Sequence, residues 1–271
     1  MVTRKQNRPS AAAEIEALGG DANFMTSLAR GLAVISGFSR EKRHMSIAQL
    51  AHKTGIPRAA VRRCLYTLAR LGYVACDDGR NFALQPKMLG LGHAYLSSTP
   101  MVVVAQPFLD RVSDAVNESC SLATLDSDDI LYVARSLTSR IISVNLNVGS
   151  RLPAYCTSVG YVMLAHLPES ELDEYLERVD LEQYTERTIT SPRKLREQLA
   201  EVRGSGYAIA DQLMELQVRS IAVPVRNTAG TVVAGMNVIV QAARISVRDM
   251  KSLFLPPLQA AARELGSQLF D

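Results

Sequence analysis

Four arginines in the first hundred residues could bind a polyanion. Arg58, Arg62 and Arg63 follow Pro57 in a stretch with helical periodicity, and Arg80 lies beside an Asp-Gly turn. The guanidinium group is a planar fork of N–H donors that matches phosphate oxygens and the O6/N7 edge of guanine. Because Arg58 and Arg62 are one helical turn apart, both can point into the major groove of a duplex. These residue types at this spacing indicate contact with DNA.

The neighbouring side chains fit the same interpretation. Ala59 and Ala60 are small enough to let the helix approach the bases closely. Arg63 lies off the line of the other two arginines, so we assign it to phosphate, and Arg80 is assigned to a minor groove or to the backbone. The spacing leaves open which arginine reads a base. The complete set of predicted DNA contacts is Ser46, Arg58, Ala59, Ala60, Arg62, Arg63, Thr67 and Arg80.

Two polar clusters further along the chain could bind a small anion. Residues 153–160 precede or begin a predicted helix, and the free N–H groups at a helix start favour negative charge. Thr157 and Ser158 add hydroxyl donors there. The second cluster follows Tyr207 and consists of Asp211, Gln212, Arg219 and Ser220. Helix capping and loop solvation would account for either cluster taken alone.

Patterns for catalysis and for metal binding are absent from the sequence. It contains no Walker loop, no G-x-G-x-x-G turn and no G-x-S-x-G elbow. The cysteines form no C-x-x-C pair and the histidines no ligand pair, so we expect reduced thiols, no metal and no cofactor. Cys156 and His166 lie near each other in the sequence, but nothing orients the imidazole. We predict that the protein is not an enzyme; a small-acid-converting enzyme with an accessory DNA-binding domain is the remote alternative.

The arginines fall within an ordered series of elements. A helix is predicted from Phe24, with one apolar stripe formed by Phe24, Leu28, Leu32, Ile35 and Phe38. Ser46 and Gln49 have the spacing of a capping box and begin a short helix. Gly55 ends that helix and Pro57 opens the arginine-bearing one.

The arginine-bearing helix is predicted over residues 57–71, with Val61, Leu65 and Leu68 on its inner face. Two β-prone runs around the Asp78-Gly79 turn then predict a hairpin. Helix, short helix, tight turn, basic helix and hairpin, in that order, are typical of a winged helix-turn-helix. The alternative is a generic three-helix domain with a solvated basic face.

The balance of charged residues differs between the first hundred residues and the rest of the chain. Residues 1–100 contain 14 Lys or Arg and 6 Asp or Glu, whereas residues 101–271 contain 16 and 21. A basic domain joined to an acidic one suggests nucleic acid at one end.

We predict a flexible tail over residues 1–22, the winged helix-turn-helix over 23–85, a linker helix over 86–100 and an effector-binding domain over 101–271. No apolar run is long enough to span a membrane and the basic start lacks a signal-peptide core, so we expect a cytoplasmic protein that does not enter a membrane.

The second half alternates strands and helices, which indicates an α+β fold. Strands are predicted over residues 121–125, 130–135, 141–148, 219–225 and 231–240. Helices are predicted over residues 102–117, 155–166 and 191–204, with a last helix after Ser246 that is interrupted at Pro256-Pro257.

Several strings in the sequence resemble the IclR family of bacterial regulators, within its branch that controls aromatic-acid catabolism. They are MTSLARGL at 25–32, IPRAAVRRCL at 56–65, LGHAYL at 91–96, RLPAYCTS at 151–158 and RSIAVP at 219–224. The likeness extends from Phe24 to Phe270. It implies a winged helix-turn-helix, a linker helix and a GAF-like α/β effector-binding domain. It also implies dimers that can pair into tetramers, binding to double-stranded operator DNA, and a contact with RNA polymerase.

The same resemblance implies an aromatic-pathway metabolite as ligand, with β-ketoadipate first and protocatechuate or 4-hydroxybenzoate as alternatives. The residues expected to bind this small carboxylate are Tyr155, Thr157, Ser158, Val159, Asp211, Arg219, Ser220 and Asn237. The family pattern differs here at Tyr161, where the nearest relatives have arginine. It also differs over residues 210–214, where this chain keeps one acidic residue, Asp211, and many family members have two. Asp211 would repel a dicarboxylate unless Arg219 pairs with it or a ligand hydroxyl donates to it.

Overall fold

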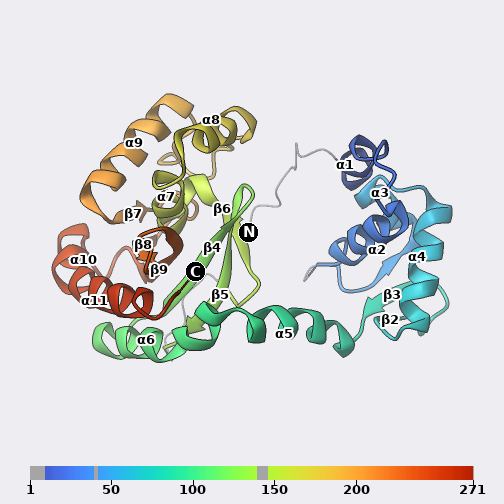
Figure 1. Cartoon of the computed structure of the whole chain (residues 1–271), viewed down its shortest axis with the longest axis horizontal. Helices are drawn as coiled ribbons and strands as arrows, with labels where there is room; N and C mark the ends of the chain where they lie inside the picture. Colours follow the sequence, from blue (N-terminus) through green and yellow to red (C-terminus); the bar gives the residue numbers. More distant parts are fainter. Residues whose placement is uncertain (1–9, 40–41, 139–145, 271) are drawn as a thin grey trace. The chain divides into compact units, whose positions relative to one another are not determined.

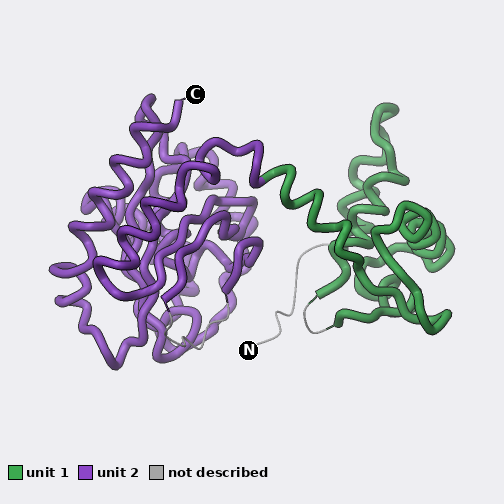
Figure 2. Tube along the Cα trace, turned by 90° about the horizontal axis from the view of Figure 1, so that it is seen from below, with its two compact units in different colours: residues 1–95 green, residues 96–271 purple. Residues whose placement is uncertain are grey.

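The computed structural model describes residues 10–39, 42–138 and 146–270. The chain forms two compact units, Met1–Tyr95 and Leu96–Asp271, which are coloured separately in Figure 2. Among the described residues, no single helix has the length and apolar composition to cross a membrane. The bent pair Pro86–Ser98 and Pro100–Val116 meets those two criteria only when its halves are counted together.

The first unit has the element order of a winged helix-turn-helix. Its elements are α1 (Ala11–Ala17), α2 (Thr26–Ser36), β1 (Met45–Ser46), α3 (Ile47–Thr54), α4 (Arg58–Arg70), β2 (Val74–Ala75) and β3 (Asn81–Leu84). The strands form a small antiparallel sheet in the order β1-β3-β2. Val34, Leu50, Val61, Leu65 and Val74 are buried together in its core. The predicted series of helices and hairpin is therefore confirmed.

Local signals fix where the two central helices begin and end. The Ser46 hydroxyl accepts a hydrogen bond from the Gln49 N–H at 3.3 Å, and the Gln49 side chain accepts one from the Ser46 N–H at 2.9 Å. This capping box satisfies two N–H groups that a helix start would otherwise leave unpaired. Gly55 ends α3 with a φ of 73°, a conformation that glycine adopts without steric cost. Pro57 then caps α4.

One expectation for the first unit is wrong, and a second holds for only part of its residues. The tail predicted over residues 1–22 contains the helix α1, which the Ser10 side chain caps and whose Ile15 is buried in the core; residues 1–9 lie outside the described part. In and around α2, Val34 is buried and Phe24, Ile35 and Phe38 of the predicted stripe pack against the core, whereas Leu28 and Leu32 of the same stripe are 58% and 54% exposed. The helical spacing was correct, but apolar spacing alone does not say which of two apolar faces turns inward.

A short 3-10 turn (Pro86–Met88) and the helix α5 (Leu89–Ser98) occupy the predicted linker, and the division between the units falls within α5. The second unit begins with α6 (Pro100–Val116). Its strands are β4 (Cys120–Asp126), β5 (Asp129–Ser136), β6 (Arg151–Pro153), β7 (Ala208–Asp211), β8 (Val218–Arg226) and β9 (Val232–Gln241). Its further helices are α7 (Ser158–Ala165), α8 (Glu169–Arg178), α9 (Pro192–Ser205), α10 (Val247–Leu253) and α11 (Leu255–Gly266).

The six strands form one antiparallel sheet, in the order β6-β5-β4-β9-β8-β7, with helices on both faces (Figure 1). One face packs on α6, α10 and α11 around residues such as Leu122, Ile221 and Val238. The other packs on α7, α8 and α9 around Ile130 and Ala222. Because side chains alternate along a strand, successive residues of one strand belong to different cores. This α+β sandwich agrees with the GAF-like prediction.

Differences from the predicted elements are local. The strand expected over 141–148 lies largely outside the described residues, and residues 146–148 are not in a strand. The helix expected over 155–166 is a 3-10 turn, Ala154–Cys156, followed by α7, because the Thr157 side chain caps the second segment. The helices α10 and α11 meet at Phe254, and the two prolines lie in the first turn of α11, where a missing N–H costs nothing.

Candidate DNA-binding surface and effector pocket

The exposed surface of α4 has two sides. Arg58, Ala59 and Arg62 are all exposed, and Tyr66, one turn beyond Arg62, is 62% exposed. Arg70 donates from Nε to the Tyr66 hydroxyl at 3.2 Å and lies over its ring. Within the described chain, no carboxylate forms an ion pair with Arg58 or Arg62. The guanidinium groups at these two positions are therefore free to bind phosphates or bases.

The other side of α4 borders an open groove against α2. Ala60, Arg63 and Thr67 line this groove together with the apolar side chains of Leu28 and Leu32. The Thr67 hydroxyl donates to the carbonyl of Arg63 at 3.1 Å, a bond within the helix. Arg63 and Thr67 are exposed, so their predicted DNA contacts stay predictions, but they do not share the stripe of Arg58 and Arg62.

The turn between β2 and β3 is held by one carboxylate. Asp78 accepts hydrogen bonds from the N–H of Arg80 at 2.8 Å, from the N–H of Asn81 at 2.6 Å and from the Asn81 side chain at 2.7 Å. These bonds, the backbone one from Asn81 first, lower the pKa of Asp78 to about 2. Arg80 is exposed beside this turn. The wing thus presents one arginine on a turn that its own sequence stabilises. Ser46 is less accessible than Arg80, because it caps α3 and pairs with β3.

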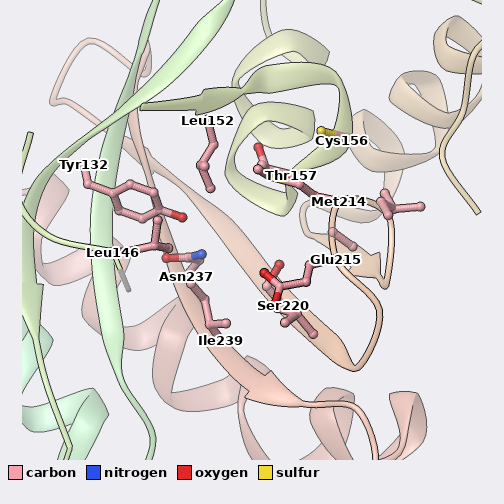
Figure 3. Close-up of a pocket in the computed structure, with 13 residues that line it drawn as sticks. Tyr132, Leu146, Leu152, Cys156, Thr157, Met214, Glu215, Ser220, Asn237 and Ile239 are labelled. Atoms are coloured by element: carbon pink, nitrogen blue, oxygen red, sulfur yellow. The ribbon is translucent and has the colours of Figure 1, made fainter. Parts of the chain in front are cut away.

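A pocket in the second unit lies between the sheet, the start of α7 and the loop between β7 and β8 (Figure 3). Its walls are mostly apolar, with a few polar groups, which is the usual character of a small-molecule site. The lining residues that Figure 3 labels are Tyr132, Leu146, Leu152, Cys156, Thr157, Met214, Glu215, Ser220, Asn237 and Ile239. None of the described lining residues is basic.

Three of the predicted effector residues line this pocket: Thr157, Ser220 and Asn237. Thr157 caps α7, and its hydroxyl oxygen accepts from the Gly160 N–H at 3.1 Å. Ser220 comes from β8, and its hydroxyl lies 2.7 Å from that of Ser158. Residues 62 positions apart are therefore joined at the pocket wall by one hydrogen bond. The two separate clusters of the sequence form one site.

Three predicted residues of the first cluster lie behind the wall. Ser158 is fully buried beneath Ser220. Val159 is buried against the sheet, where a Cβ added at Gly235 would fall 2.8 Å from its side chain. Tyr155 is buried and donates its hydroxyl to the carbonyl of Glu182 at 2.8 Å. The structure therefore places these side chains in the core that positions the pocket. Tyr161, where the family pattern differs, is also buried there.

Asp211 and Arg219 lie on the opposite face of the sheet from the pocket. They are register partners on β7 and β8, and each is one residue away from a pocket-lining neighbour, Ala210 or Ser220. The Arg219 Nε donates to the Asp211 carboxylate at 2.6 Å, and Arg187 donates to the same carboxylate at 2.6 Å. Of the two ways to relieve the charge of Asp211 that the sequence left open, the structure contains the pairing with Arg219. Because strand side chains alternate, this pair does not line the described pocket, and its predicted contact with the effector stays a prediction.

Sequence reasoning missed the pocket wall contributed by β5, above all Tyr132. This tyrosine is buried; burial raises its pKa to about 12, and a hydrogen bond with the Asn237 side chain opposes that rise. In Figure 3 the hydroxyl end of Tyr132 lies beside the side-chain amide of Asn237. Tyr132 lies in the predicted strand over 130–135, but an apolar strand gives no signal for which of its residues faces a ligand.

Comparison with known proteins agrees with this architecture. Residues 27–78 match the model of the IclR helix-turn-helix domain, and residues 93–267 match the model of the bacterial transcriptional regulator IclR C-terminal domain. The chain is 53% identical over 262 residues to the Pca regulon regulatory protein of Pseudomonas putida, covering 96% of this chain and 90% of the relative.

Two solved structures resemble the whole chain. A transcriptional regulator from Rhodococcus sp. RHA1 superposes with a TM-score of 0.79 at 44% identity, covering 91% of this chain and 98% of that one. An IclR homologue from Microbacterium hydrocarbonoxydans, complexed with 4-hydroxybenzoate, has a TM-score of 0.75 at 26% identity and covers 90% and 98%.

A winged helix-turn-helix joined to a ligand-binding α+β domain defines a class of ligand-responsive transcriptional regulators. Within that class, this chain belongs to the IclR family, as the two domain matches show. Its close homologues are named as regulators and not as enzymes.

Proposed function

We propose that this chain is a cytoplasmic, DNA-binding activator of aromatic-acid catabolism genes in the β-ketoadipate pathway, controlled by a small carboxylate effector. The exposed Arg58–Arg62 stripe, which no carboxylate neutralises in the described chain, carries the DNA-binding part. The pathway is supported by the 53% identity to a Pca regulon regulatory protein. β-Ketoadipate is the first candidate effector.

DNA recognition requires two copies of the chain in this proposal. A homodimer presents two α4 helices to two half-sites of a palindrome-like operator, with Arg58 and Arg62 in the major groove, Arg63 at phosphate and Arg80 on the wing. Two dimers can join on longer operators, and the bound regulator contacts RNA polymerase.

The effector acts by binding one arrangement of the protein better than another, because only a difference in affinity between two states can shift their populations. Couplings of this kind amount to about 1–3 kcal/mol. The pocket positions Thr157, Ser220 and Asn237 for the ligand, and the linker helix transmits the preference to the DNA-binding unit.

Protocatechuate or 4-hydroxybenzoate is the alternative effector. The observation that favours this class is the complex of the Microbacterium hydrocarbonoxydans homologue with 4-hydroxybenzoate. The partly apolar wall formed by Tyr132, Leu152 and Ile239 suits an aromatic ring as well as it suits an aliphatic chain.

The DNA-binding part is tested by Arg62→Ala. We expect operator affinity to fall by roughly 5- to 150-fold, since a bidentate arginine–base pair is worth about 1–3 kcal/mol, while the melting temperature stays unchanged because the side chain is exposed. Fluorescence anisotropy at fixed low salt measures the affinity. Arg193→Ala, which removes a 78% exposed arginine of α9, is the control. Equal affinity of Arg62→Ala and wild type would refute the assignment of α4.

The effector part is tested by a melting-temperature screen with β-ketoadipate, protocatechuate, 4-hydroxybenzoate and muconate. A true effector well above its dissociation constant stabilises the folded protein by mass action, by about 2.7 kcal/mol at a hundredfold excess. Ser220→Leu should abolish the shift while operator binding persists. A Ser220→Leu protein that still binds the effector by calorimetry would remove this residue from the site.

A further inference from the structure

A carboxylate in the pocket needs a positive countercharge that the lining residues do not supply. None of the described lining residues is basic, and the one charged lining residue is Glu215. Moving a carboxylate out of water without a compensating charge or hydrogen bonds costs several kcal/mol. Arg187 and Arg219 are not available, because both are paired with Asp211.

Arg135 on β5 lies beside the pocket and faces its side of the sheet. It is partly buried, and its Nη1 donates to the carbonyl of Leu146, whose side chain lines the pocket. Its Nε is buried with no hydrogen-bond partner, and no carboxylate within the described chain forms an ion pair with it. Burial lowers the pKa of this guanidinium, and the nearby Tyr132 opposes that change. A guanidinium remains protonated at neutral pH all the same.

Arg135 is the first member of a polar row that crosses three strands. Its register partner on β4 is Ser121, and the register partner of Ser121 on β9 is Asn237. Adjacent partners in an antiparallel sheet are about 5 Å apart, so their side chains on one face are neighbours. Asn237 lines the pocket, which places the whole row on the pocket side of the sheet.

Each member of the row has a buried polar atom that no group in the described structure satisfies. These atoms are the Nε of Arg135, the hydroxyl of Ser121 and the Oδ1 of Asn237. Ser121 is 0% exposed and Asn237 is 2% exposed. Buried polar atoms are nearly always hydrogen-bonded, so three neighbouring atoms without a partner mark a place where one bound ligand can satisfy them together. Two of them can donate to a carboxylate, and the amide of Asn237 can bond to a polar substituent of the same ligand.

We propose that Arg135, Ser121 and Asn237 form the carboxylate-binding end of the effector pocket, with Arg135 as the countercharge. This inference rests on the proposed function, in which the effector is a small carboxylate. Arg135 determines specificity for an acid over its neutral analogue, and Ser121 adds a short hydrogen bond to the same carboxylate. The opposite end of the ligand lies toward Thr157 and Ser220.

The charge is tested by titrating 4-hydroxybenzoate, its neutral analogue 4-hydroxybenzamide and β-ketoadipate into the full chain by calorimetry. Arg135→Gln should weaken binding of the acids at least roughly tenfold, because charge-assisted hydrogen bonds are about twice as strong as neutral ones, and should change binding of the amide less than threefold. Arg135→Lys should restore part of the affinity. Arg244→Gln, which breaks an ion pair with the buried Glu118, is the control that loses stability without losing affinity.

The hydroxyl is tested by Ser121→Ala. Removing an unpartnered buried hydroxyl should leave the melting temperature of the free protein unchanged or raise it, while affinity for the acids falls roughly fivefold. Ser113→Ala is the matched control: this buried serine donates to the carbonyl of Glu118 at 2.9 Å, so the variant should lose stability and keep its affinity.

The outcomes separate the two proposals. If the wild-type chain binds none of the acids, the effector part of the proposed function fails, and this inference fails with it. If the wild type binds an acid that Arg135→Gln and Ser121→Ala bind as tightly, the inference is overturned and the proposed function stands. Equal losses for the acid and the amide would also overturn it, because a merely structural role predicts that result.

Discussion

The outer face of α4 and the effector pocket are built in opposite ways. Arg58 and Arg62 come from one helix and are exposed, and their positions follow from helical spacing. The pocket instead combines β5, β7, β8 and β9 with the start of α7, and its polar residues Thr157 and Asn237 are buried. A surface on one helix tolerates substitution of its side chains one at a time, whereas a pocket between packed layers depends on the backbone of every layer.

This contrast predicts which substitutions should change binding affinity without changing the stability of the fold. On α4, arginine substitutions should change affinity for DNA and leave stability alone. Around the pocket, substitutions one residue apart on a strand should differ in kind, because one reaches the ligand and the next reaches the opposite core.

The largest expected effect is on the backbone that supports the pocket. A Cβ at Gly160 would fall 1.9 Å from the carbonyl oxygen of Ala154, so α7 could not keep its place. We expect Gly160→Ala to reduce the free energy of unfolding of the second unit by about 3 kcal/mol or more, as measured by denaturant titration. Gly204→Ala is the control, because a Cβ there has no neighbour within 4 Å. This change should raise the free energy of unfolding by at most about 1 kcal/mol. A Gly160→Ala protein of normal stability would contradict the close packing.

The next effect concerns the ion pair on the far face of the sheet. Asp211→Asn should destabilise the second unit by about 1–3 kcal/mol, because it removes the charged partner of Arg219, whose side chain is 11% exposed. Affinity for the effector should stay unchanged, in contrast to Ser220→Leu on the neighbouring strand. Calorimetry that shows a lost ligand response in Asp211→Asn would place this carboxylate in the site after all.

The same pair predicts a pH dependence. Burial raises the pKa of Asp211, but the hydrogen bond and charge of Arg219 and the charge of Arg187 outweigh it, so the folded pKa lies below its ordinary value. A lowered folded pKa means stability that is present above the unfolded pKa and is lost as the pH falls through the folded one. The difference in stability between wild type and Asp211→Asn should therefore be full at neutral pH and shrink below about pH 4. A difference that stays constant down to pH 2 would disprove this linkage.

A smaller effect separates the two sides of α4. Arg63 lines the groove beside α2, so Arg63→Ala should weaken operator binding less than Arg62→Ala and equally for all sequences. If Arg63 contacts phosphate as predicted, the slope of log affinity against log salt should decrease by about 0.9. Anisotropy titrations at several salt concentrations measure both quantities. Sequence-dependent losses from Arg63→Ala would move base readout to this side of the helix.

The smallest effect is expected at the wing. Asp78→Ala removes three hydrogen bonds that hold the turn beside Arg80. Because this turn is exposed and short, we expect operator affinity to fall by only a few fold. The melting temperature should change little. A loss as large as that of Arg62→Ala would mean that the wing, and not α4, provides the main contact.

The sequence by itself determined the first unit closely. The capping box of Ser46 and Gln49, the Gly55–Pro57 turn and the inner face of α4 are local signals, and a helix is a local structure. Arg58 and Arg62 could therefore be assigned to an exposed face from their spacing. The apolar stripe along α2 did not show that Leu28 and Leu32 stay exposed while Ile35 packs inward, because two apolar faces compete there and only packing decides between them.

Tertiary structure decided the pocket. Thr157 and Ser220 were found in the sequence as polar clusters, but their meeting depends on the order of strands in the sheet, which no local pattern encodes. The register of β4, β5 and β9 likewise places Arg135, Ser121 and Asn237 in one row. Strand alternation then turned Asp211 and Arg219 to the other face. Periodicity fixes which residues share a face, and long-range strand pairing fixes which faces meet, because only the second requires segments far apart in the chain to come together.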